Sequence, residues 1–345
     1  MKVLIIKLSA FGDIIHALPA LDDILKRPEV AEVHWLVDER FAFVCDVFPT
    51  EVKIHSIAMK GQHPIQAIWK TIRALRQEHF DVIIDLQSLI KSSLIAKLIG
   101  GKIYGFDATE VKEKPATWIQ ESVTFHSDDK NIVQKCRRVA SAPWQSASVP
   151  TKSIPYIAPH IHKGLPHMPI PSILDHTPLP WVILNLGGSW ATKQLPNTTW
   201  VHIAKGIEQR GAQAIICWGN KQEQEKALHI ANECQAIPLP ERLDILTLCS
   251  LFRHSASVIT TDTGILHLAS ALKTPTISFW GVTPSVRNGA FGEHDIQVES
   301  NPECGPCIKR TCANFICMDM IDAETILQHL DQQLLLNVPQ GDNVA

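Results

Sequence analysis

Short apolar runs alternate with longer amphipathic segments along the first half of the chain. Val3-Leu4-Ile5-Ile6 is a continuous apolar run, which is typical of a strand buried on both faces of a parallel sheet. The spacing of apolar residues over 17–25 then predicts a helix. Further strands are predicted at 32–37 and 81–86, and further helices at 65–77 and 90–99. This alternation predicts a doubly wound α/β domain.

A proline-rich segment separates this half from the rest of the chain. Six prolines occur in the 23 positions from Ala158 to Pro180, too many for a helix or a central strand. Residues 158–180 are therefore predicted to link an amino-terminal domain, 1–157, to a carboxy-terminal domain, 181–322.

The alternation of apolar runs and helical patterns resumes after the linker. Strands are predicted at 181–186, 214–218, 257–260 and 276–280, with helices from about Trp200, Gln222 and Leu266. A terminal helix and tail are expected over 323–345. The chain is thus expected to form two doubly wound domains that face a cleft. Since ligands of open α/β sheets bind beyond the carboxyl ends of the strands, the functional residues should follow the strands.

The composition and the charge of the chain argue against several classes of protein. The 345 residues are 45% hydrophobic and 19% charged, as in globular proteins, and no apolar run approaches the ~20 residues of a membrane span. A net charge of −3 provides no overall basic field, so nucleic acid is not an expected partner. Lys2, Lys7 and Asp13 interrupt the first apolar stretch, which argues against a secretory signal and favours a cytoplasmic location.

The turn after the first strand carries a glycine and an acid. Gly12 and Asp13 lie between the strand and the helical pattern that begins near Ile14. A carboxylate in this place could accept a proton from an attacking hydroxyl group. It could also simply cap the helix.

Two turns in the second half carry groups suited to a phosphate. The stretch 187–193 follows a strand and combines glycine amides, hydroxyls and the ammonium of Lys193. Asp262 and Thr263 lead into a helix whose first amides face outward, and His267 comes one turn later. The simpler alternatives are an ordinary turn with a solvated lysine, a helix cap and a core histidine. No P-loop or G-x-G-x-x-G pattern is present, which disfavours P-loop hydrolysis and nicotinamide binding.

Several motifs in order along both halves resemble the lipopolysaccharide heptosyltransferases of glycosyltransferase family 9. They are S-A-F-G-D-I-I-H-A-L-P-A-L near the amino terminus, D-L-Q-S-L-I-K-S-S at 85–93, G-S-x-x-x-K at 188–193, W-G-N-K-Q-E-Q-E at 218–225 and T-D-T-G-I-L-H-L-A-S-A-L at 261–272. The similarity extends to about Val286. The amino-terminal motifs are most similar to the heptosyltransferase I group.

The resemblance implies a GT-B fold of two Rossmann-like domains and an inverting transfer of L-glycero-D-manno-heptose from ADP-heptose to Kdo of Kdo-lipid A. Asp13 would be the general base, and Lys193 would stabilise the leaving ADP without a catalytic metal. The donor-binding residues that the resemblance implies are Ser189, Lys193, Glu223, Arg242, Asp262, Thr263, Gly264 and His267. Relatives carry an apolar side chain at the position of Arg242.

The acceptor is expected to bind the first domain. The expected acceptor residues are Gly12, His16, Gln87 and Lys91. Lys60, Lys70 or Arg73 could also meet a phosphorylated lipid, although a solvated surface position is the simpler explanation of the two lysines. The resemblance further implies peripheral contact with the cytoplasmic face of the inner membrane. The alternatives are transfer to a later core heptose or to a protein, and a non-catalytic nucleotide-sugar-binding protein.

Four of the nine cysteines form a C-x2-C-x4-C-x4-C array at Cys304, Cys307, Cys312 and Cys317. Four thiolates at such spacing could hold zinc or iron in a tetrahedral site. Reduced thiols without metal and a redox-active pair are the alternatives. With four protein ligands a metal would have no open position, so its expected role is structural and no cofactor is expected in catalysis.

Overall fold

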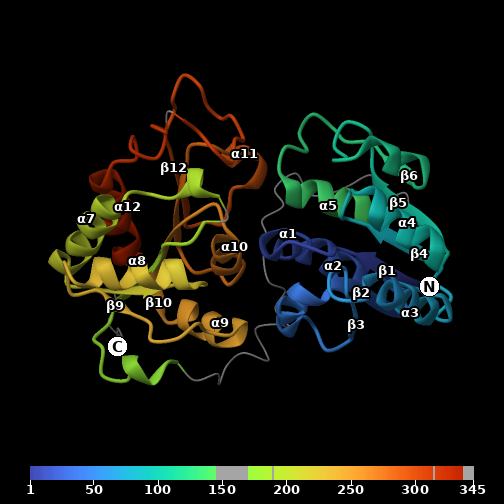
Figure 1. The fold of residues 1–345 in the computed structure, drawn as a ribbon, viewed down its shortest axis with the longest axis horizontal. Helices are drawn as coiled ribbons and strands as arrows, with labels where there is room; N and C mark the ends of the chain where they lie inside the picture. The colour runs from blue at the N-terminus through green and yellow to red at the C-terminus, as the bar shows by residue number, and fades with distance from the viewer. Residues whose placement is uncertain (145–169, 189, 314, 337–345) are drawn as a thin grey trace, which may run out of the picture. The chain divides into compact units, whose positions relative to one another are not determined.

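The computed structural model describes residues 1–144, 170–188, 190–313 and 315–336 (Figure 1). The chain divides into two compact units, Met1–Gly164 and Leu165–Ala345, and each is described by itself. Positions 158–169 of the predicted linker and 337–345 of the predicted tail lie outside the described residues, so the predicted domain boundaries stay predictions. No helix in the described residues is long and apolar enough to cross a membrane.

The first unit is built on a parallel six-stranded sheet in the order β3-β2-β1-β4-β5-β6. Its strands are β1 (Lys2–Ile6), β2 (Glu32–Asp38), β3 (Val52–Ile57), β4 (Val82–Asp85), β5 (Lys102–Phe106) and β6 (Glu121–Val123). The strand order reverses between β1 and β4, where a Rossmann-like sheet opens a crevice for ligands. The residues that follow these two strands are therefore the natural site candidates of this unit.

Helices cover the first sheet. They are α1 (Phe11–His16), α2 (Leu18–Leu25), α3 (Pro64–Arg76), α4 (Ile90–Ile99) and α5 (Ile132–Ser141), with 3-10 turns η1 (Glu39–Val47), η2 (Lys114–Trp118) and η3 (Ala142–Trp144). Ile72 and Leu75 of α3 and Ile95 of α4 are buried in one apolar cluster with residues of β1, β2 and β4. The helix expected over 17–25 is preceded by a separate short helix, α1, so the prediction that helical structure begins near Ile14 is wrong.

The second unit repeats the topology, with the sheet order β12-β11-β10-β7-β8-β9 and only parallel pairings. Its strands are β7 (Trp181–Asn185), β8 (Gln213–Cys217), β9 (Ile237–Pro238), β10 (Ser255–Thr261), β11 (Thr276–Trp280) and β12 (Asp295–Glu299). Here the order reverses between β7 and β10. Two Rossmann-like units confirm the predicted fold class.

The helices of the second unit are α7 (Asn197–Gln209), α8 (Lys221–Ala231), α9 (Ile245–Arg253), α10 (Gly264–Ala271), α11 (Ser285–Asn288) and α12 (Ala323–Leu336), with turns η4 (Ser172–Leu174) and η5 (Ala191–Lys193). The terminal helix α12 packs on α7 (Figure 1). A Cβ on Gly206 of α7 would lie only 2.2 Å from a methyl carbon of Leu327, so glycine is required for this close approach. The terminal helix is thus part of the core of the second unit.

Candidate functional site

Asp13 lies in the first turn of α1, beyond the carboxyl end of β1. Its Oδ2 accepts a hydrogen bond of 3.3 Å from the backbone N–H of Ala10, the N-cap residue. Asp13 therefore helps to cap the helix from its third position and not from the N-cap. The side chain is partly exposed, and its second oxygen, Oδ1, accepts no hydrogen bond from a described residue. One oxygen can therefore receive a proton while the other holds the carboxylate in place.

Two lysines keep Asp13 ionised. Burial raises the pKa of Asp13, but the positive charges of Lys7 and Lys112 lower it, and the result lies below the usual value of an aspartate. The carboxylate is consequently charged at neutral pH, which is the form that can accept a proton. Lys112 is exposed, whereas Lys7 is 5% exposed and its Nζ donates to the carbonyl oxygen of Leu86 at 2.7 Å.

The side chain of Gln87, which follows β4, forms hydrogen bonds with the loop after β1. Its Oε1 accepts hydrogen bonds from the backbone N–H groups of Leu8 at 2.8 Å and Ser9 at 3.1 Å, and the residue is 3% exposed. This arrangement fits a residue that positions the Asp13 loop. Contact of Gln87 with an acceptor stays a prediction.

The buried Asp85 organises the rest of the 85–93 motif. Its carboxylate accepts hydrogen bonds from the backbone N–H of Gln87 at 2.9 Å, from Ser92 Oγ at 2.8 Å and from Ser93 Oγ at 2.9 Å. Burial raises the pKa of Asp85, while these donors oppose the rise. The hydrogen bonds between Asp85, Ser92 and Ser93 therefore account for the presence of these three residues in the motif.

The other predicted acceptor residues lie on two helices of the first unit. Gly12 and the buried His16 belong to α1, and the electrostatic interaction with His16 also lowers the pKa of Asp13. Lys91 is exposed in the first turn of α4. Their contact with an acceptor stays a prediction.

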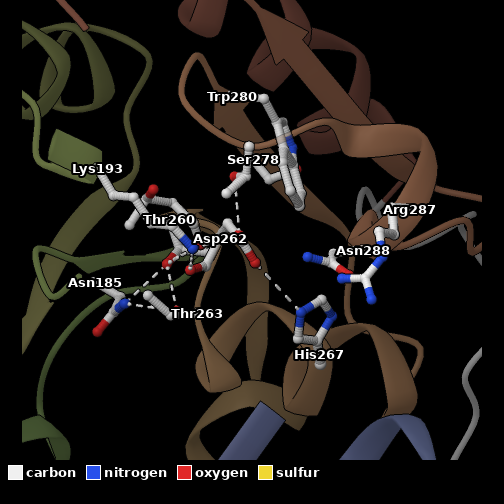
Figure 2. Close-up of polar contacts among 12 residues, drawn as sticks. Asn185, Lys193, Thr260, Asp262, Thr263, His267, Ser278, Trp280, Arg287 and Asn288 are labelled. Atoms are coloured by element: carbon white, nitrogen blue, oxygen red, sulfur yellow. Dashed lines mark hydrogen bonds and ion pairs between the residues drawn. The ribbon is translucent and has the colours of Figure 1, made fainter. Parts of the chain in front are cut away.

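Lys193 and Asp262 form the centre of a polar cluster in the second unit (Figure 2). Lys193, at the end of η5, places Nζ 2.5 Å from Asp262 Oδ2 and 3.3 Å from the carbonyl oxygen of Asp262. Thr283, which follows β11, donates its hydroxyl to the same Oδ2 at 3.0 Å. The loops after three neighbouring strands, β7, β10 and β11, are thus joined through one carboxylate.

The charge on Asp262 is strongly stabilised. Burial would raise the pKa of Asp262, but the neighbouring imidazole of His267 and the positive charge of Lys193 outweigh it and hold the pKa well below its usual range. His267 Nε2 lies 3.8 Å from Asp262 Oδ1 (Figure 2). Lys193 is therefore not the solvated lysine of the simpler alternative, because it is 8% exposed and paired.

The amino-terminal end of α10 offers backbone donors at the same place. Thr263 is the N-cap residue, yet its side chain makes no capping hydrogen bond. Instead its Oγ1 accepts from Asn185 Nδ2 at 3.3 Å, and Asn185 also donates to Thr260 Oγ1 at 2.8 Å (Figure 2). No side chain in the described parts of the chain accepts from the first amides of the helix, beginning at Gly264, and such free donors suit a phosphate.

Glu223 lies against the loop that follows β7. Its carboxylate accepts from the backbone N–H of Gly219 and from Asn220 Nδ2, both at 2.7 Å. A Cβ on Gly187 would lie 2.9 Å from Glu223 Oε1, so the loop passes close to this carboxylate. The two predicted donor elements, 187–193 and Glu223, are therefore neighbours.

The remaining two predicted donor residues are Ser189 and Arg242. Ser189 lies outside the described residues. Arg242 is exposed between β9 and α9, and within the described part of the chain its side chain makes no hydrogen bond or ion pair. Its role stays a prediction.

Several residues of the cluster were missed by sequence reasoning. They are Asn185, Trp190, Thr260 and Thr283. Arg287 and Asn288 are drawn in the same view (Figure 2). Asn185, Thr260 and Thr283 had a readable signal, because each is a polar residue at or just beyond the carboxyl end of a buried apolar strand.

The cysteine array lies beside this cluster. All four cysteines line one small cavity, together with Thr192, Gly281 and Val282. They are free thiols, and no three of their sulfur atoms lie within 4.8 Å of one another in the described residues. The donor set and the shared cavity fit a thiolate metal site, provided that the sulfurs draw closer together when the metal binds.

Known proteins are similar to this chain over almost its whole length. Lipopolysaccharide heptosyltransferase 1 of Pseudomonas aeruginosa is 26% identical over 90% of this chain and 87% of its own. The structure of E. coli heptosyltransferase WaaC with ADP superposes with a TM-score of 0.79 at 22% identity, covering 96% of this chain and 100% of that one. The iron-containing glycosyltransferase TibC from enterotoxigenic E. coli has a TM-score of 0.59 at 10% identity, covering 98% of this chain and 77% of its own.

A model of glycosyltransferase family 9 (heptosyltransferase) matches residues 68–316. This match includes the part of α3 from Ile68 onward and all of α4 in the first unit, and the whole Lys193–Asp262 cluster of the second. It confirms the predicted resemblance and the prediction of an enzyme that transfers a sugar. The chain belongs to glycosyltransferase family 9, the heptosyltransferases.

Proposed function

We propose that this protein transfers L-glycero-D-manno-heptose from ADP-heptose to Kdo of Kdo-lipid A, with Asp13 as the general base. The observation that carries the proposal is the ionised carboxylate of Asp13, which has one oxygen without a donor at the switch point of the first sheet. Family membership supports the heptose donor. The relatives named as heptosyltransferase 1 support the first step of core assembly.

The reaction is a single displacement at the anomeric carbon. As the acceptor oxygen bonds to that carbon, its proton passes to Asp13 Oδ1, and the bond to the β-phosphate breaks with its electron pair going to ADP. A single base is sufficient for inversion, whereas retention by double displacement would need a separate nucleophile. Lys193 and the first amides of α10 would stabilise the charge on ADP, because fixed donors placed where charge develops lower the barrier.

The surroundings of Asp13 favour an acidic acceptor. Lys112 is exposed and lies close enough to lower the pKa of Asp13. Kdo carries a carboxylate, which such a cation would attract to the base. The same charge that keeps Asp13 ionised would thus help to bind the acceptor.

Contact with the inner membrane is supported by a surface that we call the α3–α4–η2 face. It carries five exposed large apolar side chains, namely Ile65, Trp69, Leu94, Leu98 and Trp118. Helix α4 packs against both α3 and η2, so these elements are neighbours. Trp118 is 84% exposed and Ile65 is 70% exposed. Amphipathic aromatic side chains favour the interface between lipid and water.

The charges of the α3–α4–η2 face suit anionic lipid. Its three elements contain the cations Lys70, Arg73, Arg76, Lys91, Lys97 and Lys114. They contain no aspartate or glutamate, although the whole chain has a net charge of −3. Each cation near an anionic leaflet contributes about 1 kcal/mol of attraction. We therefore assign this face to peripheral binding at the cytoplasmic leaflet.

The four array cysteines are proposed to hold a structural zinc or iron ion. The ion would supply only tetrahedral cross-linking of the segment by thiolates. Cys304, Cys307, Cys312 and Cys317 would be its ligands. The presence of iron in the similarly folded TibC supports this proposal.

The test is transfer by the purified protein from ADP-heptose to Kdo-lipid A in the presence of a chelator. Release of ADP together with a lipid mass increase of one heptose is expected. ADP-heptose binding without a mass increase would move the search to a later core heptose or to a protein acceptor. Binding with no turnover on any acceptor would favour a nucleotide-sugar-binding protein.

A further inference from the structure

Hydrogen bonds of its backbone hold the segment between Cys307 and Cys312 against the proposed donor site. The carbonyl oxygen of Lys309 accepts a hydrogen bond of 2.8 Å from Thr192 Oγ1 in the loop after β7. The backbone N–H of Ile308 donates to the carbonyl oxygen of Val282 at 2.9 Å, in the loop after β11. These two anchors fix the position of the next residue, Arg310, beside the Lys193–Asp262 cluster.

Arg310 and Lys193 share one indole ring. The guanidinium carbon of Arg310 lies 5.1 Å from the ring centroid of Trp190, and Lys193 Nζ lies 4.5 Å from the same centroid. Both distances are within the range of a cation–π interaction. Trp190 thus holds two cations together at the loop that the sequence predicts to bind phosphate.

The two cations differ in how far they are already neutralised. Lys193 is buried and paired with Asp262. Arg310 is exposed, and no described carboxylate lies within 4.0 Å of its guanidinium group. A nucleoside diphosphate brings several negative charges and gains another as its sugar departs. The paired Lys193 offsets these charges only in part, whereas the charge of Arg310 is still available.

We propose that Arg310 binds the diphosphate of the nucleotide-sugar donor, as a second cation beside Lys193. The inference rests on the proposed function and adds a residue from a different part of the chain. The planar guanidinium would donate N–H groups to phosphate oxygens, a geometry that arginine provides and lysine does not. The backbone anchors and Trp190 position it, which gives the cysteine array a reason to lie next to the donor site.

The test compares ligands that differ only in their phosphates. Binding of ADP, AMP and adenosine to the full-length protein is measured by calorimetry, with weak ligands measured by competition. Arg310→Gln is expected to weaken ADP binding about tenfold and to leave adenosine binding unchanged, because only charge-assisted phosphate contacts are lost. Arg310→Lys should recover part of the loss, since it keeps the charge without the fork.

Lys309→Gln is the matched control. It removes one exposed positive charge at the neighbouring position, while the backbone carbonyl that holds Thr192 is retained. ADP binding by this variant should equal that of the wild type. An equal loss in both variants would reduce the effect to general electrostatics and overturn the specific role of Arg310.

Three further outcomes of these binding measurements would also test the role of Arg310. Equal weakening of ADP and adenosine in Arg310→Gln would mean that the residue only supports the Trp190 loop, and the proposal would fail. Unchanged ADP affinity would overturn it as well. If the wild type binds no ADP, the proposed function itself fails, so the two failures are distinguishable.

Discussion

Lys193 Nζ and Asp262 Oδ2 lie 2.5 Å apart, although 69 positions separate the two residues in the chain. The pair exists because β7 and β10 are neighbours at the point where the strand order reverses, so the loops that follow them meet. Both side chains are less than one-tenth exposed. A cation and an anion buried in this way depend strongly on one another.

Asp262→Asn is expected to lower the free energy of unfolding by about 3 to 5 kcal/mol, because it leaves Lys193 charged and unpaired in a buried place. Urea unfolding of the full-length protein would measure the loss. The double variant Lys193→Met, Asp262→Asn serves as the control, since it removes both charges. The double variant should lower the free energy of unfolding by less than the sum of the losses measured for Lys193→Met and Asp262→Asn alone. A loss equal to that sum would contradict the coupling between the two residues.

The Lys193–Asp262 pair should also make the free energy of unfolding depend on pH in the acid range. The pKa of Asp262 is held below its usual value, so its contribution to stability is complete above the pKa of an unfolded aspartate. That contribution is lost as the pH falls below the unfolded value towards the folded one. The unfolding free energy of the wild type should therefore fall more steeply between about pH 5 and pH 3 than that of Asp262→Asn.

The architecture could be predicted from the sequence because strands buried on both faces of a parallel sheet consist of short continuous apolar runs. Val3-Leu4-Ile5-Ile6 and Trp181-Val182-Ile183-Leu184 are such runs, and both are strands. The apolar pattern does not predict β3 or β5, because their residues alternate in polarity or include glycine, as in V-K-I-H-S-I. Local pattern thus identifies central strands better than peripheral ones.

Changing the cysteine array should change metal content and stability together. Cys312→Ser is expected to reduce zinc or iron from about one ion per chain to a trace, and to lower the thermal midpoint, because a thiolate ligand is lost. Metal analysis of the purified protein and thermal unfolding would measure both effects. Cys234→Ser, a partly buried cysteine outside the array, is the control and should retain the metal. A wild-type protein without metal would contradict the proposed site.

Membrane binding should depend on both components of the α3–α4–η2 face. Trp69→Ser with Trp118→Ser is expected to reduce co-flotation with vesicles of anionic lipid by about tenfold, because two exposed indoles no longer enter the interface. Binding should also weaken as salt rises and be poor with neutral vesicles. Leu228→Ser removes an exposed apolar residue of the second unit and should have no effect. Equal binding to neutral and anionic vesicles would contradict the role of the cations.

Individual site residues followed from the sequence only where the motif was local. Asp13 and Thr263 lie where a strand is followed by a helix, after β1 and β10, so their location was readable. The contact of Arg310 with Trp190 was not, because it depends on how a segment 120 positions further along the chain folds back. The capping role of Asp13 was also misassigned, since helical structure begins three residues earlier than its apolar pattern indicates.

Asp13→Asn should lower turnover by about 10² to 10⁴-fold while ADP-heptose binding is retained, because the amide cannot accept the proton. Single-turnover kinetics and calorimetry would separate these two effects. Asp128→Asn, an exposed acid of the same unit, is the control and should behave as the wild type. Retained turnover in Asp13→Asn would exclude a general-base role.

The pH dependence of the reaction should follow the charges around Asp13. The base works only when ionised, so activity that depends on it is lost as the pH falls through its pKa, which lies below the usual aspartate value. The wild-type kcat/KM should therefore show no acid limb from Asp13 between about pH 5 and pH 8. Lys112→Gln removes one of the positive charges that lower this pKa, so the acid limb should move to higher pH. Lys60→Gln, which removes an exposed lysine elsewhere in the unit, should leave the profile unchanged. If both variants shifted the profile equally, the effect would come from overall charge and not from the neighbour of the base.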